Sequence, residues 1–153
     1  MRHGQAEHSA VNDAARRLTA VGVEQARRGG AHLAQLSLDV AQIFCSPYRR
    51  ARETAQLVRE SLPGVPLVQT DCLVPDADPR SLQRLLDAQG SGTVLCVGHQ
   101  PLLGYALQWL VDGGIGAGCP FETGSLALLR REFPGPGGAE LRWHRGPEEL
   151  LPQ

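Results

Sequence analysis

Three groups of residues in this sequence carry side chains that can handle a phosphoryl group. The first is Arg2-His3-Gly4, near the amino end. A neutral imidazole is a nucleophile, a guanidinium offers a fork of donors that matches two phosphoryl oxygens, and a Gly lets the backbone come close to them. Alone, the tripeptide is also typical of an ordinary surface pair of His and Arg. The interpretation therefore depends on the other two groups.

The second group opens a predicted helix. Ser46-Pro47 follows the apolar run 40–45, and a Ser cap followed by a Pro is typical of a helix start. Arg50 would then lie in the first helical turn, where free backbone N–H groups and the helix dipole favour an anion. We expect Arg49 and Arg52 to be solvated helix charges.

The third group ends a predicted strand. The apolar run 94–97 leads into Gly98 and His99, so a second imidazole lies at the carboxyl end of a buried strand. Active-site residues of open parallel sheets lie at such strand ends. In isolation His99 could equally bond a neighbouring carbonyl. We expect His8 to lie on a surface loop, His32 on a helix surface and His144 at a sheet edge.

The order Arg-His-Gly, Ser-Pro-x-x-Arg-Ala-x-x-Thr, strand-Gly-His-x-Pro resembles the histidine phosphatase superfamily, whose fold is that of phosphoglycerate mutase. The short length and the linking segments are most similar to its SixA branch of phosphohistidine phosphatases. The resemblance implies that His3 becomes transiently phosphorylated, that Arg2 and Arg50 hold the phosphoryl group, and that His99 binds a third oxygen. It also implies that Gly4 contacts the substrate and that the reaction needs no metal and no cofactor. Thr123 either places a donor near the site or belongs to a plain turn.

The substrate depends on whether a general acid is present. Superfamily members that cleave sugar or glycerate phosphates usually protonate the leaving alkoxide with a Glu or an Asp. The stretch 70–86 has no convincing Glu, and its candidates are Asp71, Asp76 and Asp78, the last better explained as a helix cap. We therefore expect removal of phosphate from phosphohistidine on a signalling or phosphotransfer protein. The alternatives are a small-molecule phosphomonoesterase using Asp76, or a non-catalytic module that binds phosphate or a phosphoprotein.

The elements that position these residues form an α/β pattern. We expect one domain over residues 1–153, a three-layer α/β/α sandwich with a mostly parallel sheet. Predicted strands cover 40–45, 65–68 and 93–98, and 126–129 pairs with 141–144 in a hairpin. Helices begin near Thr19, Pro47, Asp78-Pro79 and Pro101.

One central strand is truncated in this pattern. The superfamily's Arg-His-Gly loop follows an apolar strand of about five residues, whereas here only Met1 precedes Arg2. An absent inner strand would leave two rows of unpaired backbone groups. We therefore expect the natural start to lie upstream.

Composition excludes several classes of protein. The 153 residues are 42% hydrophobic and 20% charged, with a formal net charge of -1, so nothing favours nucleic acid or an anionic membrane as a partner. The four Cys are far apart and support neither a zinc site nor a disulfide framework. Without a signal peptide or a membrane-length apolar run, we expect a monomer in the bacterial cytoplasm.

Overall fold

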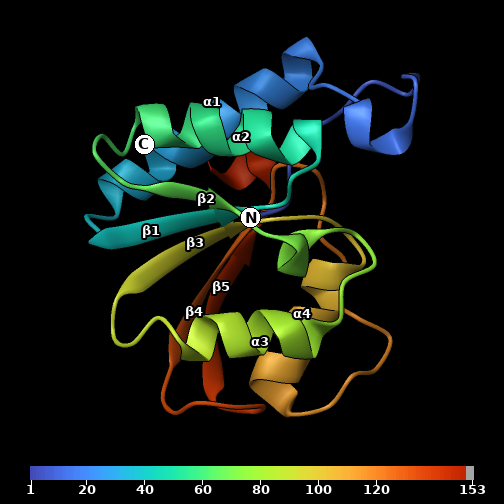
Figure 1. Cartoon of the computed structure of the whole chain (residues 1–153). Helices are drawn as coiled ribbons and strands as arrows, with labels where there is room; N and C mark the ends of the chain where they lie inside the picture. The colour runs from blue at the N-terminus through green and yellow to red at the C-terminus, as the bar shows by residue number, and fades with distance from the viewer. Residues whose placement is uncertain (151–153) are drawn as a thin grey trace.

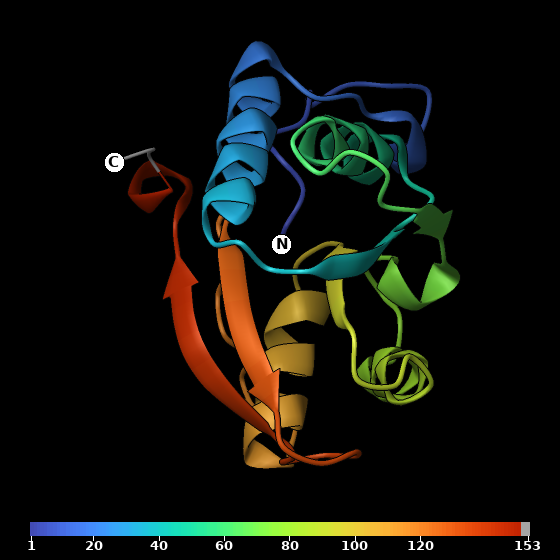
Figure 2. The same ribbon diagram turned by 90° about the vertical axis from the view of Figure 1, so that its left-hand side faces the viewer.

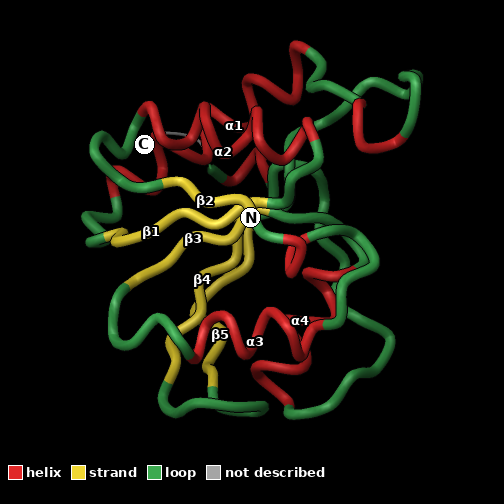
Figure 3. Tube along the Cα trace, viewed as in Figure 1, coloured by secondary structure: helices red, strands yellow, loops and turns green. Residues whose placement is uncertain are grey.

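The computed structural model describes residues 1–150. Its central sheet is parallel and has the order β2-β1-β3, formed by β1 (Val40–Cys45), β2 (Leu67–Gln69) and β3 (Thr93–Val97). The strands β4 (Leu126–Arg131) and β5 (Ala139–Arg145) pair antiparallel as the predicted hairpin. The predicted strands are thus present, with β2 beginning two residues later than its apolar run. In Figure 3 the strands converge on the amino terminus.

Two helices cover each face of the sheet, which is the predicted three-layer arrangement (Figure 1). The helices α1 (Ala20–Gln35) and α2 (Arg49–Glu60) pack together on one side. On the other side lie α3 (Pro79–Asp87) and α4 (Leu102–Asp112). No helix among residues 1–150 is long and apolar enough to cross a membrane.

The helix starts follow their predicted caps in two cases and differ in a third. The side chain of Thr19 accepts from Gly22 N, and that of Asp78 accepts from Arg80 N. The helix α2 begins at Arg49 with Tyr48 at its N-cap, so Ser46-Pro47 does not cap it as predicted. Instead the Ser46 hydroxyl accepts from Tyr48 N and lies beside His99.

The first residues of the chain occupy the position between β3 and β4. Arg2 forms a parallel bridge with Gly98, and its N–H donates to the Ser125 carbonyl. The amino group of Met1 donates to the Cys96 carbonyl at 2.8 Å. Met1–His3 therefore lies alongside β3 in parallel, and these backbone bonds fix His3 at the carboxyl end of β3.

A cavity of about 750 Å³ lies beside Met1, next to β3 and β4. Figure 2 shows β3 and the hairpin separated on the side where the cavity lies. Its lining includes apolar side chains from β3, α4 and β4, and Met1 lies against it. The cavity is lined by Met1, Leu95, Leu103, Leu107 and Leu129, among others.

Candidate active site

His3 is held with one ring nitrogen bound and the other directed at a guanidinium. Its Nδ1 lies 2.7 Å from the Gly4 carbonyl, which can only accept, so Nδ1 carries the proton. The free lone pair is then on Nε2, and Arg50 Nε donates to it at 3.2 Å. Burial, with the nearby charges of Arg50, Arg2 and Arg16, lowers the pKa of His3 to about 4 against the bond to Gly4. The imidazole is thus neutral at pH 7, as an attacking nitrogen must be.

Arg50 is buried in the first turn of α2, where the sequence placed it. Besides the bond to His3, its Nη1 donates to the Asp13 carbonyl at 2.7 Å. Its Nη2 lies 3.1 Å from an oxygen of the Asp13 carboxylate. The ring of Tyr48 packs against the guanidinium, with 5.2 Å between its centroid and Cζ.

His99 follows β3 and faces His3, with 4.9 Å between the ring centroids. Its Nε2 lies 2.8 Å from the Ser46 hydroxyl, while its buried Nδ1 has no partner within residues 1–150. Burial, and then the neighbouring His3 and Arg50, lowers the pKa of His99 to about 2. A neutral His99 can offer a phosphoryl oxygen a hydrogen bond but no positive charge.

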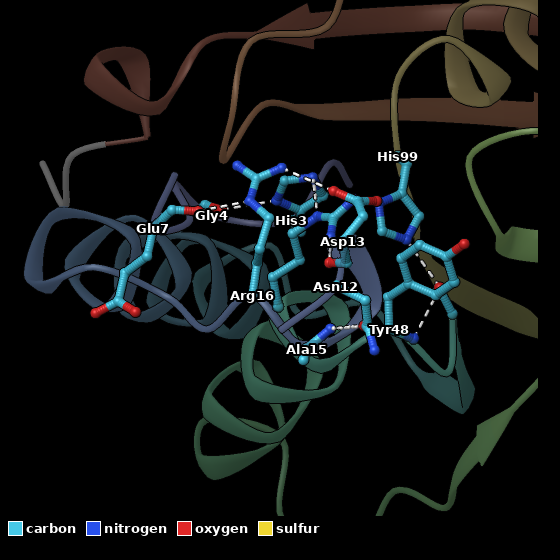
Figure 4. Close-up of polar contacts among 11 residues, drawn as sticks. His3, Gly4, Glu7, Asn12, Asp13, Ala15, Arg16, Tyr48 and His99 are labelled. Atoms are coloured by element: carbon cyan, nitrogen blue, oxygen red, sulfur yellow. Dashed lines mark hydrogen bonds and ion pairs between the residues drawn. The ribbon is translucent and has the colours of Figure 1, made fainter. Parts of the chain in front are cut away.

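Arg2 and Arg16 complete the group, and the sequence analysis did not identify Arg16 as a member of it. Arg2 Nη1 donates to the Phe121 carbonyl at 2.6 Å. Burial, and next the charges of Arg50 and Arg16, lowers the pKa of the Arg2 guanidinium. Arg16 lies in the polar loop assigned to the surface, and its Nη1 is 3.0 Å from the Asp13 carboxylate (Figure 4). Arg16 begins the pattern Arg-x-Leu-Thr-x-x-Gly at residues 16–22, but its contact depends on how the loop folds back over α2.

Gly4 packs closely against α1 in this structure, and its substrate contact stays a prediction. Its N–H donates to the Thr54 hydroxyl at 3.0 Å, so this amide is engaged. A Cβ at Gly4 would lie 2.4 Å from the Gly22 carbonyl oxygen, so the loop can approach α1 only without a side chain. Close backbone packing is thus the reason for Gly that the structure gives.

The turn containing Thr123 contacts the backbone of His3. Gly124 N donates to the His3 carbonyl at 3.0 Å. No hydrogen bond of the Thr123 side chain is found in the described part of the chain, and its substrate contact stays a prediction.

The candidate general acids are not joined to this group. Asp78 caps α3, as the sequence predicts. No hydrogen bond or ion pair among residues 1–150 connects Asp71 or Asp76 with His3, Arg2, Arg50 or His99. The carboxylate that does reach the group belongs to Asp13.

Four side chains outside the group complete the comparison with the sequence. His8 is exposed, as expected. His32 is buried and contacts Trp143 edge-on, so its assignment to a helix surface is wrong, because β5 covers that face of α1. Arg49 is exposed, whereas Arg52 is half-buried, with an unpaired Nε in the described structure. Within residues 1–150 no group of three His, Cys, Asp or Glu side chains is arranged to hold a metal ion.

The fold and this group of side chains define a class of protein: an α/β domain with guanidinium groups around a neutral imidazole at its strand ends. Comparison with known proteins agrees. Residues 1–74 match the model of the histidine phosphatase superfamily (branch 1). The chain belongs to the histidine phosphatase superfamily.

Its relatives include phosphohistidine phosphatases. The chain is 29% identical to phosphohistidine phosphatase SixA of Escherichia coli, over 98% of this chain and 93% of that protein. A SixA homolog of Haemophilus influenzae is 34% identical over 68% of this chain and 70% of its own length. A solved structure of the protein histidine phosphatase SixA with tungstate superposes with a TM-score of 0.86, at 28% identity, covering 98% of this chain and 96% of that one.

Proposed function

We propose that this chain is a phosphohistidine phosphatase that works through a phosphorylated His3. The observation that carries the proposal is the unprotonated Nε2 of His3, whose lone pair faces Arg50. The two nitrogens, His3 Nε2 and Arg50 Nε, are 3.2 Å apart. The fold and the names of its SixA relatives support the same reaction. Arg2 and Arg50 would bind the phosphoryl oxygens as bidentate donors, and His99 would donate from Nδ1. The protein's own guanidinium groups supply the positive charge that the transferring group requires.

In the first step, His3 Nε2 attacks phosphorus. The bond between Nε2 and phosphorus forms while the bond from phosphorus to the substrate's imidazole nitrogen breaks. The leaving imidazole takes its proton from solvent. The phosphoryl oxygens keep their negative charge throughout, so fixed donors contribute most of the catalysis. Arg50 Nε must release the Nε2 lone pair as the attack begins.

In the second step, water attacks the phosphoryl group on His3. A bond from phosphorus to the water oxygen forms, the bond to Nε2 breaks, and the water proton passes to solvent. Inorganic phosphate leaves and His3 returns to its neutral form. The proton on Nδ1 stays on the ring and is donated to the Gly4 carbonyl, which keeps Nε2 as the reacting atom in every cycle.

The substrate class is argued from the leaving group. An alkoxide needs a general acid, whereas imidazole departs readily once its ring nitrogen is protonated. Neither Asp71 nor Asp76 is joined to the candidate site in the described structure, which supports a phosphoramidate over an alcohol phosphate. The partner would be a protein that presents a phosphorylated His on its surface.

The test uses a histidine-phosphorylated domain and the purified chain without added metal. We expect phosphate release, acid-labile labelling of His3, and loss of both in His3→Ala. His8→Ala is the matched control, because His8 is exposed in the neighbouring loop, and it should retain full turnover.

Two other results would replace the proposal. Strong turnover of a sugar phosphate that is lost in Asp76→Asn would indicate a phosphomonoesterase. Binding of phosphate without any labelling of His3 would indicate a non-catalytic module.

A further inference from the structure

Each of the three nitrogens of the Arg50 guanidinium donates a hydrogen bond in this structure. Its Nε donates to His3, its Nη1 to the Asp13 carbonyl, and its Nη2 to the Asp13 carboxylate. The other oxygen of this carboxylate lies 3.0 Å from Arg16 Nη1. A planar anion thus joins two guanidinium groups beside the nitrogen that would attack phosphorus. Figure 4 shows Asp13 close to His3 and to Arg16.

The segment that carries Asp13 is attached to the domain at its base and through the bond from Arg50 to the Asp13 carbonyl. Asp13 begins the short 3₁₀ helix η1 (Asp13–Ala15), whose N–H at Ala15 is capped by Asn12. At the base, Ala6 pairs with Leu18, and Glu7 N donates to the Arg17 carbonyl. Between these points the Asp13 side chain is 57% exposed, whereas that of Arg50 is 5% exposed. The carboxylate can therefore leave for solvent, while the guanidinium stays in place.

We propose that Asp13 is an internal competitor for the phosphate-binding site, which the phosphoryl group of the substrate displaces from Arg50 and Arg16. Its departure makes Arg16 a third guanidinium for phosphate. The inference rests on the proposed function, because it assigns Arg50 to phosphate.

The exchange favours the substrate because the two anions differ in charge and shape. A carboxylate carries one charge on two oxygens, whereas a phosphoryl group carries close to two on three. Charge-assisted bonds to Arg strengthen with the charge of the acceptor. Burial works against ionisation of Asp13, but bonds from Arg16 and Arg50 outweigh it and hold the pKa of its carboxyl below the usual range. Asp13 is thus an anion throughout the neutral pH range and would repel phosphate if it stayed.

The experiment measures binding of inorganic phosphate to Asp13→Asn by titration calorimetry. Asn keeps the shape of the side chain and removes its charge. We expect phosphate to bind up to about fivefold more tightly, the scale set by a partly exposed ion pair. Asp112→Asn is the matched control, because it removes the same charge from the far end of α4 and should leave the affinity unchanged.

Other outcomes would overturn the proposal. Unchanged or weaker phosphate binding in a folded Asp13→Asn protein would show that Asp13 orders the guanidinium groups instead of competing with phosphate. Asp13→Ala is the second variant, and it should change the affinity in the same direction. With a phosphohistidine substrate we expect KM to fall and kcat to hold; a fall in kcat would make Asp13 a general base for the water.

Failure of this inference and failure of the proposed function give different results. Calorimetry reports phosphate binding without any turnover. Tighter binding in Asp13→Asn, with no hydrolysis of phosphohistidine by the unaltered chain, would reject the enzymatic proposal and keep the competitor. Hydrolysis that requires His3, with equal phosphate affinity in Asp13→Asn and the unaltered chain, would keep the enzymatic proposal and reject the competitor.

Discussion

The orientation of His99 depends on one buried hydroxyl group. Ser46 Oγ accepts from Tyr48 N at 3.1 Å, so its own proton can go to His99 Nε2, 2.8 Å away. The ring proton of His99 is then on Nδ1, a buried atom without a partner in the described structure. In this tautomer His99 presents a donor to a phosphoryl oxygen. Ser46 is therefore a positioning residue for His99.

Ser46→Ala tests this role. Loss of the hydroxyl should let Nδ1 lose its proton in part of the molecules, and kcat should fall about 5- to 10-fold, the value of one buried hydrogen bond. The measurements are kcat and the ¹⁵N shifts of the His99 ring, which report the tautomer. Ser91→Ala, an exposed site at the start of β3, should change neither. An altered kcat with an unaltered tautomer would contradict the assignment.

At the scale of elements, the loop after His3 is fixed by contact with the first turn of α1. A Cβ at Gly22 would lie 2.0 Å from the Gln5 carbonyl oxygen, and one at Gly4 would meet Gly22 in return. The Gly4 amide bonds Thr54 of α2, which in turn donates to the Arg50 carbonyl at 2.7 Å. Two helices thus hold the residue that follows His3.

Gly22→Ala should therefore destabilise the fold by about 1–3 kcal/mol, the cost of overpacking. Ala would otherwise favour the helix by up to about 1 kcal/mol, so a net loss shows that the backbone contact dominates. Activity should fall as well, because Gln5 and Gly4 must shift. Denaturant unfolding and kcat provide the measurements, with Gly114→Ala as control, where a Cβ would meet nothing within 4 Å. Equal stability of the two variants would contradict the argument.

Local patterns predicted the elements well and the group around His3 in part. The strand β3 and the caps at Thr19 and Asp78 depend on neighbouring residues, which the sequence displays directly. Ser46 was misread as a cap because its partner, His99, is 53 positions away in the chain. Arg16 and Asp13 lie in a polar stretch without periodicity. Their contacts with each other and with Arg50 arise only when that stretch folds over α2, so the pattern Arg-x-Leu-Thr-x-x-Gly at residues 16–22 marks Arg16 without showing what it contacts.

At the scale of the whole molecule, several buried groups that would otherwise carry charge couple the fold to pH. Burial is the first cause in each case: the pKa of His3 falls to about 4, that of His99 to about 2 and that of the Met1 amino group to about 6. Their ordinary values are 6.5 for His and 8.0 for the amine. Between the lowered and the ordinary pKa, the unfolded chain binds more protons than the folded one. Stability therefore rises with pH across these windows.

We expect the free energy of unfolding to increase from pH 4 to pH 6.5, with a slope of about 1.4 kcal/mol per pH unit for each of the two His when fully titrating. Urea unfolding at a series of pH values measures this. His99→Asn should show a shallower slope below pH 6.5 and His8→Ala an unchanged one. A flat profile between pH 4 and 6.5 would refute the expectation.

The buried amino group of Met1 also governs how this protein can be handled. The amino group bonds the Cys96 carbonyl of β3, and Met1 lines the cavity between β3 and β4, two residues from His3. A purification tag joined there would have to thread its last residues along β3 or pull Met1 out of the sheet, and His3 would move with it. Affinity handles, fluorophores and surface tethers are better attached elsewhere.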